Sequence, residues 1–385
     1  MPSSEFATSV AKTPSLDEYQ MNANIELISK DDAQAAETII LDGLHVEFAT
    51  PKLPSPLLTA SGTLEVASLV VVEVKSRCGA KGQSYLFSPN KELLPALAHS
   101  VSVAFDQVKG RSCLPELNTD FLLDKFKLFG GTGILTMAFA AIDMATWDLL
   151  GNALHKPLYQ LLGGSYKEVP SYESSGLSIG TVSQVINQAQ EFIADGNTRM
   201  KVRLGYETVA QEINLISELK NHFGGGLEIM VDYKQALSVD QAFERCTELE
   251  GLELLWIEQP ILADMHEVSA ELTRAIDTPI QIEENLWSLT EFERVLNLRS
   301  SKYLMPDVGK IGGATQWLRA AKRAEIHGVK ISSHLYPEIS AHLLTSINNA
   351  HYLEYADWTK LQFSGHISPS NNNYKLTEKW GVGFT

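Results

Sequence analysis

Cysteine is scarce in this chain, with three residues among 385. Cys78, Cys113 and Cys246 lie far apart and none belongs to a C-x-x-C pair, which argues against a disulfide framework or a cysteine-based metal site. We expect all three to be free thiols, buried or half-buried.

Basic charge and long apolar runs are also in short supply. The chain has 31 Lys and Arg against 47 Asp and Glu, a net charge of −16, whereas a nucleic-acid-binding protein needs a basic surface for the phosphates. No apolar stretch approaches the roughly 18 uninterrupted residues of a membrane span, and the N-terminus lacks the apolar core of a secretory signal. We therefore expect a cytoplasmic protein that binds neither nucleic acid nor membrane.

The first part of the chain predicts an α+β domain behind a leader. Residues 1–37 show weak periodicity and are expected to form a loosely ordered leader. Residues 38–164 contain strand-like runs followed by helical patterns, which favours an antiparallel meander packed against helices. The strand-like runs are IILDGLHVEFAT, SLVVVEVKS and QSYLF, and the helical ones are KELLPALAHSVSVAF and TMAFAAIDMATWDLLGNAL.

A loop at about residues 53–66 separates the first two of these strands. Proline, serine and glycine give it hinges, and Leu57, Leu58 and Leu64 make its tip apolar. An exposed apolar loop is typical of a lid that closes over a site.

Residues 165–356 predict a (β/α)8 barrel. Short β-rich runs alternate there with helical patterns, and eight such runs match the number that a closed barrel needs. The runs are VPSYES, RMKVRL, LEIMVD, LELLWIE, PIQIEE, KYLMPD, VKISSH and HYLEY. Residues 357–385 are expected to return to the N-terminal domain.

Charged residues stand at the polar ends of these runs. Because the carboxyl ends of parallel barrel strands meet on one face, such residues are expected to surround a single pocket. They are Lys201, Arg203, Asp232, Glu258, Glu284, Asp307, His334 and Glu354.

Three of these acids, Asp232, Glu258 and Glu284, follow three consecutive strands. Hard carboxylate oxygens with room for water and substrate suit octahedral Mg²⁺ better than zinc. The structural alternative is that each acid caps the next helix or pairs with a lysine. The succession of all three favours a metal site.

His334 follows Asp307 by one βα unit, so the two are expected to lie side by side. A carboxylate beside an imidazole fixes its tautomer and raises its pKa, which gives a general base, although a single histidine is often structural. Lys201 and Arg203 are two residues apart and are expected to point into the barrel from one strand.

These segments together resemble the enolase superfamily, and within it the mandelate racemase subgroup. The resemblance covers nearly all of the chain after the leader and is carried by VDYKQ, WIEQP, QIEEN, MPDVGKIGG, SSHLYPEISAHLL and AAIDMATWDLLG. It implies an enolase-type (β/α)8 barrel, or modified TIM barrel, with an N-terminal α+β capping domain. It also implies that Asp232, Glu258 and Glu284 bind one Mg²⁺ per subunit, which Mn²⁺ can replace, and that the protein is a homo-oligomer between dimer and octamer.

The resemblance further implies roles for the other rim residues. His334 with Asp307 becomes the base, and Lys201 a cation beside the substrate carboxylate. Glu354 becomes an acid that hydrogen-bonds this carboxylate, for which it needs a raised pKa. The substrate-binding residues implied are Leu57, Leu64, Tyr85, Ser174, Lys310 and Leu335.

Two positions depart from the family pattern. Arg203 stands where the family has the second lysine of Lys-x-Lys, and a guanidinium is a poor base at neutral pH. Lys234 stands where the family has an asparagine near the α-hydroxyl group. We hypothesise that Lys234, crowded by Lys201 and Arg203, has a depressed pKa and transfers a proton. Binding of a substrate carboxylate or hydroxyl group is the alternative.

The predicted reaction is Mg²⁺-dependent removal of the α-proton of a 2-hydroxycarboxylate through an enediolate. The breadth of the resemblance, including the apolar lid, makes a racemase or epimerase the expected function. Arg203 favours the alternative, dehydration of an acid sugar (aldonate or aldarate) with His334 as the single base. A non-catalytic binding protein would be expected to lose a metal ligand or the Asp-His pair, and this chain keeps them all.

Overall fold

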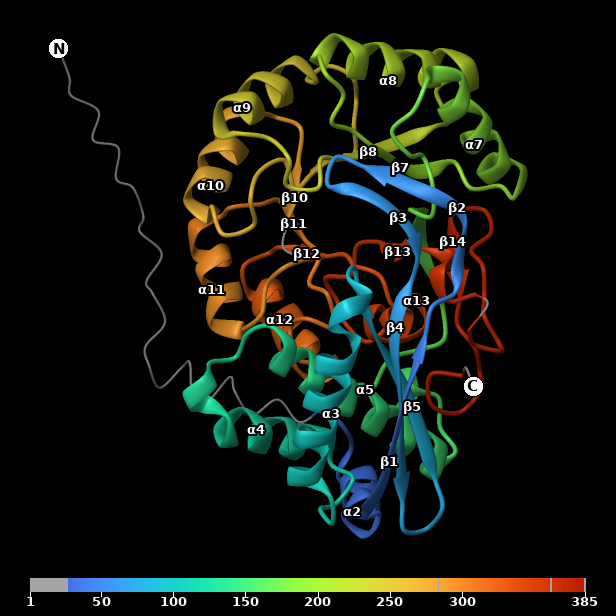
Figure 1. Cartoon of the computed structure of the whole chain (residues 1–385), viewed down its shortest axis with the longest axis vertical. Helices are drawn as coiled ribbons and strands as arrows, with labels where there is room; N and C mark the ends of the chain where they lie inside the picture. Colours follow the sequence, from blue (N-terminus) through green and yellow to red (C-terminus); the bar gives the residue numbers. More distant parts are fainter. Residues whose placement is uncertain (1–26, 283, 361, 384–385) are drawn as a thin grey trace, which may run out of the picture.

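The computed structural model describes residues 27–282, 284–360 and 362–383. An N-terminal capping domain lies against one side of a barrel formed by the rest of the chain (Figure 1). The eight parallel strands of the described residues and the capping domain confirm the fold class predicted from the sequence.

The capping domain is built on a three-stranded antiparallel sheet. Its order is β1-β4-β5, and each pairing joins consecutive strand-like runs of the predicted meander. The strands are β1 (Leu41–Ala49), β4 (Ser68–Ser76) and β5 (Lys81–Ser88), and the helices that follow are α3 (Leu94–Val108), α4 (Pro115–Lys125) and α5 (Ile134–Leu154). Helix α5 packs on β4 and β5, while α3 packs on β1 and β4.

Helix α5 is the core of this domain. By length and composition alone it could cross a membrane, but every residue from Thr136 to Gly151 is buried inside the protein. A helix that is apolar on all sides is expected in such a position. Its two buried acids have partners: Asp143 accepts a hydrogen bond from Thr119 Oγ1, and Asp148 accepts one from the Gln83 amide.

The described end of the expected leader is a helix. In α2 (Lys30–Thr38) the Ser29 hydroxyl accepts a hydrogen bond from the Asp32 amide, as an N-cap does. Ala36 is fully buried, and Asp32 pairs with Lys156 at 2.7 Å. Ordered packing therefore begins before residue 38, the expected boundary, whereas residues 1–26 lie outside the described residues.

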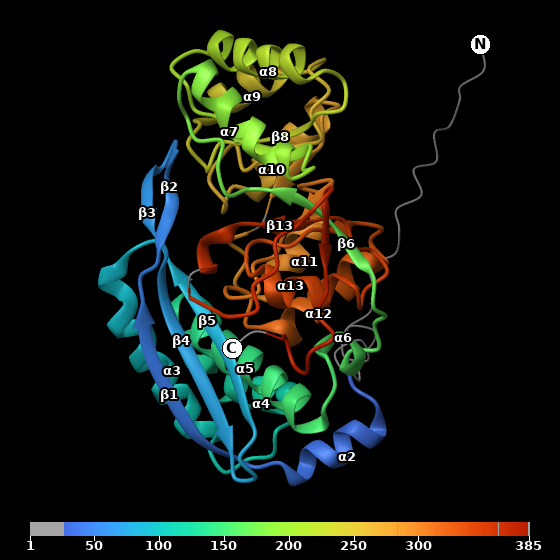
Figure 2. The ribbon, with the colours of Figure 1, turned by 90° about the vertical axis from the view of Figure 1, so that its right-hand side faces the viewer.

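The segment expected to be a lid loop is a β-hairpin. Strands β2 (Lys52–Thr59) and β3 (Gly62–Val66) pair with Leu57 opposite Leu64, and a two-residue turn joins Thr59 to Gly62. The hairpin rises from the capping sheet toward the barrel (Figure 2). The cross-strand leucine pair and the tight turn explain why this segment forms strands rather than a loop.

The barrel strands follow one another in space as they do along the chain. Their order is β12-β11-β10-β9-β8-β7-β6-β13, and the Ile331 bridge to Ala350 brings the two ends of the sheet together. The strands are β6 (Glu168–Glu173), β7 (Arg199–Arg203), β8 (Glu228–Asp232), β9 (Ile257–Glu258), β10 (Ile280–Ile282), β11 (Tyr303–Leu304), β12 (Lys330–Ile331) and β13 (Leu353–Tyr355).

Helices surround this sheet. Three of them begin at capping boxes, at Thr181, Thr208 and Ser238, in which a hydroxyl group and a glutamine satisfy the first free amides. The helices are α6 (Leu158–Leu161), α7 (Val182–Ala194), α8 (Val209–Phe223), α9 (Val239–Glu248), α10 (His266–Ala275), α11 (Leu289–Leu298), α12 (Ala314–Ile326) and α13 (Pro337–Leu344).

The C-terminal segment contacts both domains. Strand β14 (Asn373–Lys375) first pairs antiparallel with barrel strand β6. Gly381 then bridges Pro157, and the Val382 amide donates to Asp148 of α5. The segment thus reaches the N-terminal domain, as expected, but only after extending the barrel sheet.

The cysteines are free thiols in different surroundings. Cys113 and Cys246 are buried, and burial raises the pKa of the Cys246 thiol to about 12. Cys78 is exposed, which corrects the expectation that all three are at least half-buried.

Candidate active site

Strand ends bring the predicted charges to one rim. Asp232 ends β8 and is paired in register with Arg203 on one side and with Glu258 on the other. Asp307 and His334 form a parallel bridge just beyond the ends of β11 and β12. The expectation that these residues share one face of the barrel is therefore met.

Lys201 is completely buried among carboxylates. Its Nζ lies 2.6 Å from Glu258 Oε1, 2.5 Å from Glu354 Oε1 and 3.7 Å from Asp232 Oδ2. Burial of an ammonium group is costly unless such partners compensate it. Lys201 is thus a fixed positive charge inside the rim.

Arg203 is held on both branches of its guanidinium. Nη1 lies 2.8 Å from Asp232 Oδ2, and Nη2 donates to both the carbonyl and the hydroxyl oxygen of Ser174. The Ser174 hydroxyl in turn donates to Glu354 Oε1 at 2.7 Å. Arg203 therefore orients Asp232 and Ser174, and Ser174 lies within the charged cluster.

Lys234 reaches the same cluster from beyond the end of its strand. Its φ of 49° lies in the left-handed region, yet the side chain still turns inward, with Nζ 2.9 Å from Glu284 Oε2 and 3.7 Å from Asp232 Oδ2. The expected depression of its pKa is wrong for this arrangement. Burial lowers the pKa, but attraction by Glu284 and Asp232 outweighs it and raises the pKa above its ordinary value.

The three acids proposed as metal ligands are linked through ammonium groups. Lys201 lies between Asp232 and Glu258, and Lys234 lies between Asp232 and Glu284. Among the described residues no group of three His, Cys, Asp or Glu side chains is arranged to hold a metal ion directly. The donor set nevertheless fits Mg²⁺, because hard carboxylate oxygens are the ligands that this ion prefers and the two ammonium groups between them occupy a strongly anionic site.

His334 is oriented by carboxylates on two sides. Its Nδ1 lies 2.6 Å from Asp307 Oδ2, and its Nε2 lies 2.9 Å from Glu284 Oε2 and 3.9 Å from Glu354 Oε2. Burial lowers the pKa of His334, but Glu284, Glu354 and the hydrogen bond to Asp307 raise it to about 9. The predicted Asp307–His334 pair and the direction of its effect on the pKa are both present.

The pKa of Glu354 shifts downward, whereas a proton donor would need a raised pKa. Burial raises its pKa, but Lys201, His334 and Lys234 together hold the pKa below its ordinary value. Glu354 Oε2 also accepts a hydrogen bond from the Leu335 amide at 2.9 Å. In this arrangement the group is an ionised acceptor rather than a proton donor, and Leu335 touches the rim through its backbone.

Lys310 lies at the edge of the cluster. Its Nζ donates to Asn285 Oδ1 at 2.8 Å and is 3.7 Å from Glu284 Oε1. Its amide donates to Asp307 Oδ1, so that the turn following β11 also holds the acid that orients His334.

The hairpin β2–β3 is fastened over the rim at Leu58, whose carbonyl also accepts from the Ile179 amide at 3.0 Å, and at Ser61. The Leu58 amide donates to Ser178 Oγ, and the Ser61 hydroxyl donates to the Lys234 carbonyl at 2.8 Å. Leu57 is buried and Leu64 half-buried. The expected lid is therefore closed, and Ser61 and Ser178 are contacts that the sequence did not reveal.

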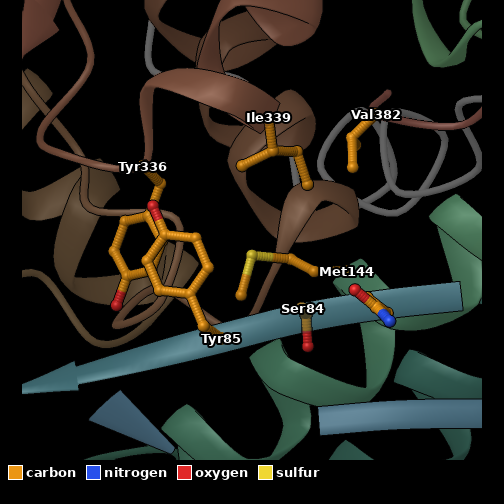
Figure 3. A pocket seen from close by; sticks show the side chains of 7 residues that line it. Ser84, Tyr85, Met144, Tyr336, Ile339 and Val382 are labelled. Carbon is orange, nitrogen blue, oxygen red and sulfur yellow. The ribbon is translucent and has the colours of Figure 1, made fainter. Parts of the chain in front are cut away.

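Tyr85 lies between the two domains rather than among the rim charges. Its hydroxyl donates to Glu338 Oε2 at 2.9 Å, and its ring stacks on Tyr336 with centroids 4.9 Å apart. Figure 3 shows the two rings side by side at a small cavity that Met144, Ile339 and Val382 also line. These contacts connect β5 of the capping domain to α13 of the barrel.

Fold and rim together define an α/β barrel with a capping domain and a carboxylate-rich face at the ends of the strands. Residues 184–385 match the family of enolase C-terminal domain-like proteins, and residues 44–163 match the mandelate racemase / muconate lactonizing enzyme N-terminal domain. The chain belongs to this family, the mandelate racemase and muconate lactonizing enzyme branch of the enolase superfamily.

Relatives of this chain include proteins named as sugar-acid dehydratases. The chain is 26% identical over 379 residues to the L-talarate/galactarate dehydratase of Salmonella typhimurium, which covers 95% of each chain. It is 30% identical over 213 residues to the D-galactonate dehydratase of Verminephrobacter eiseniae, 54% of this chain and 56% of that one.

Solved structures share the whole fold. A Bradyrhizobium enolase complexed with magnesium and mandelic acid has a TM-score of 0.86 at 29% identity, covering 90% of this chain and 96% of the other. The L-talarate dehydratase of a Polaromonas species, complexed with magnesium and L-glucarate, has a TM-score of 0.81 at 26% identity, covering 90% and 94%.

Proposed function

We propose that this enzyme removes the proton α to the carboxylate of an acid sugar and then expels the 3-hydroxyl group as water. In this proposal Asp232, Glu258 and Glu284 hold Mg²⁺, which the type of their oxygens and the pairing of Asp232 beside Glu258 at neighbouring strand ends support. The bound ion supplies positive charge for the substrate carboxylate, whose α-proton is otherwise barely acidic.

His334 is the base in this proposal. Its Nδ1 is committed to Asp307 at 2.6 Å, which leaves Nε2, facing the carboxylate cluster, as the nitrogen that exchanges a proton. His334 takes the proton from C2 of the substrate. The same imidazolium returns it to the 3-hydroxyl group as the C3–O bond breaks, so that water leaves and the enol product becomes a 2-keto-3-deoxy acid.

Lys201 and Ser174 are fixed polar groups that stabilise the negative charge of the enediolate intermediate. Lys201 is buried and cannot reorient without breaking three contacts with carboxylates. A preorganised positive charge beside the developing negative charge of an enediolate is commonly the largest catalytic contribution.

The observation that favours dehydration over racemisation is the set of hydrogen bonds that Arg203 makes to Asp232 and Ser174. Racemisation needs a second base on the opposite side of the substrate, where the family pattern places a lysine. Here Arg203 donates to Asp232 and Ser174 through both Nη atoms, and a guanidinium does not lose its proton at neutral pH. The dehydratases among the relatives also favour dehydration over racemisation.

Proton NMR of the enzyme in D₂O with Mg²⁺ tests the proposal, across a panel of aldonates, aldarates and mandelate. We expect loss of the α-proton signal only as a 2-keto-3-deoxy acid accumulates. Appearance of both configurations at C2 without loss of water would contradict dehydration, and no change with any substrate would contradict α-proton removal on this panel.

Racemisation or epimerisation is the second candidate, because Lys234 brings another ammonium group to the rim, 3.7 Å from Asp232. The related Bradyrhizobium structure contains mandelic acid, a substrate type with no 3-hydroxyl group to eliminate. If Lys234 transfers the second proton, then Lys234→Met lowers kcat by orders of magnitude. A kcat near that of the wild type would remove Lys234 from this role.

We further propose that the enzyme is a cytoplasmic homo-oligomer, between dimer and octamer. The capping domain presents apolar side chains that a further subunit would bury: Leu128 is 95% exposed and Phe129 77% exposed. Light scattering coupled to size-exclusion chromatography measures the state directly.

A further inference from the structure

The ammonium group of Lys234 lies where two proposed metal ligands meet. Its Nζ is 2.9 Å from Glu284 Oε2 and 3.7 Å from Asp232 Oδ2. A divalent cation that binds both carboxylates needs the same space and the same oxygen lone pairs. The ammonium group and the cation cannot both occupy this space, because both need the same carboxylate oxygens and their positive charges repel each other.

The backbone of Lys234 is fixed on both sides. Its amide donates to Asp232 Oδ1 at 2.8 Å, and its carbonyl accepts from the hydroxyl of Ser61 at the tip of the hairpin. The next residue, Gln235, donates its amide to the Gln259 carbonyl. The peptide therefore stays in place when the ammonium group leaves, and only the flexible side chain has to swing.

The other lysines of the rim are held differently. Lys201 is completely buried and touches Glu258 and Glu354 as well as Asp232. Lys310 donates to the neutral Asn285 and is 3.7 Å from Glu284. The Lys234 side chain is 23% exposed and its close partners are carboxylates. It is the lysine that a cation can displace.

We propose that Lys234 is a built-in competitor of the divalent cation: it neutralises Asp232 and Glu284 before the cation binds and is displaced when it binds. This inference rests on the proposed function, because it takes Asp232 and Glu284 as metal ligands. It gives Lys234 a role in setting metal affinity that is separate from any proton transfer.

Titration calorimetry with Mg²⁺ alone, without substrate, tests this inference. We expect Lys234→Met and Lys234→Gln to bind Mg²⁺ roughly tenfold to a hundredfold more tightly than the wild type, because a charged contact no longer has to be broken. Lys234→Arg keeps the charge and is expected to stay near wild-type affinity.

Lys310→Met is the matched control, since it removes a lysine near Glu284 that does not bridge two ligands. We expect its Mg²⁺ affinity to change by less than about threefold. Thermal unfolding of each variant in EDTA and in Mg²⁺ gives a second readout, with the largest stabilisation by Mg²⁺ expected for Lys234→Met and Lys234→Gln.

Equal or weaker Mg²⁺ affinity in both uncharged variants, with cooperative unfolding retained, would overturn this inference alone. Absence of Mg²⁺ binding by the wild type and by every variant would overturn the proposed metal site and this inference together.

Discussion

The two sides of the catalytic rim hold their positive charges in different ways. On the inner side, Lys201 and Arg203 project from β7 and are 0% and 2% exposed, each with several fixed partners. On the outer side, Lys234 and Lys310 project from loops beyond the strands, and their side chains are 23% and 21% exposed. Asp232 joins the two sides through Arg203 and Lys234.

This difference separates charged groups that hold their neighbours in place from charged groups that can move. A buried charge with several partners is costly to displace, because its departure leaves each partner as an uncompensated charge in a region of low polarity. A partly exposed lysine on a loop regains water when it leaves, so its displacement costs less than that of a buried one. We infer that the inner side keeps its geometry through the reaction, whereas the outer side rearranges when the metal ion and substrate bind.

His334 faces both sides, so its replacement is the most severe change. His334→Asn removes the proposed base but keeps a polar side chain beside Asp307, and we expect α-proton exchange to fall roughly 10²–10⁴-fold. Exchange in D₂O followed by NMR measures this. His342→Asn, in a buried helix outside the rim, is the control and should exchange at a rate close to that of the wild type. An exchange rate for His334→Asn within threefold of the wild type would mean that another group removes the proton.

Arg203→Met breaks the inner side. It leaves Asp232 and the Ser174 oxygens without their buried partner, and we expect the free energy of unfolding to fall by about 3–5 kcal/mol. Urea denaturation in EDTA measures it. Lys234→Met provides the comparison on the outer side and should cost less, about 1.5–3 kcal/mol, since the side chain is partly exposed. Similar losses for the two variants would erase the distinction between the two sides.

His342 offers a reference outside the rim. Its Nδ1 accepts from the Tyr159 amide and its Nε2 lies 3.4 Å from the Val382 carbonyl, contacts that suit the neutral ring. Burial lowers its pKa to about 4, whereas the unfolded chain binds the proton near pH 6.5. The unfolded state therefore holds one more proton between these values, and stability falls as the pH drops through this window, by about 1.4 kcal/mol per pH unit.

Urea denaturation at pH 7.5, 6 and 5 measures this contribution. His342→Asn should show a shallower loss of stability than the wild type between pH 6.5 and 5. His327→Asn, at an exposed helix end, should follow the wild-type slope. Parallel slopes for all three proteins would assign the acid sensitivity to other groups.

Ser61→Ala is expected to have the smallest effect. It removes the hydrogen bond from the hairpin tip to the Lys234 carbonyl, while the hydrogen bonds of Leu58 to Ser178 and Ile179 remain. We expect kcat/KM to fall roughly twofold to tenfold with unchanged thermal stability. Ser178→Ala should act in the same direction, and an unchanged kcat/KM in the double variant would remove the hairpin from the catalytic cycle.

The sequence predicted those features of the rim that follow from strand periodicity. Acids at the ends of consecutive parallel strands must meet on one face, so the neighbouring positions of Asp232 and Glu258, and of Asp307 and His334, could be inferred from the order of the strands alone. The antiparallel capping sheet was predictable from its short strand-like apolar runs.

Features that depend on partners distant in the chain were not predictable. Tyr85 meets Glu338 only because the two domains dock. The pKa of Lys234 rises because its ammonium group lies 2.9 Å from the Glu284 carboxylate, a contact that the order of the strands does not reveal. The sequence predicts a loop at the hairpin, because proline is uncommon inside strands. The pairing of Leu57 with Leu64 becomes visible only in the structure.

A crystal structure of the protein soaked in Mn²⁺, with an anomalous difference map, tests the central claim most directly. The account predicts one peak bound by oxygens of Asp232, Glu258 and Glu284 at about 2.0–2.3 Å. It also predicts that Lys234 Nζ has left Glu284, while Lys201 Nζ still lies between Glu258 and Glu354. A peak at other residues, or Mn²⁺ bound to the three acids with Lys201 displaced and Lys234 in place, would contradict it.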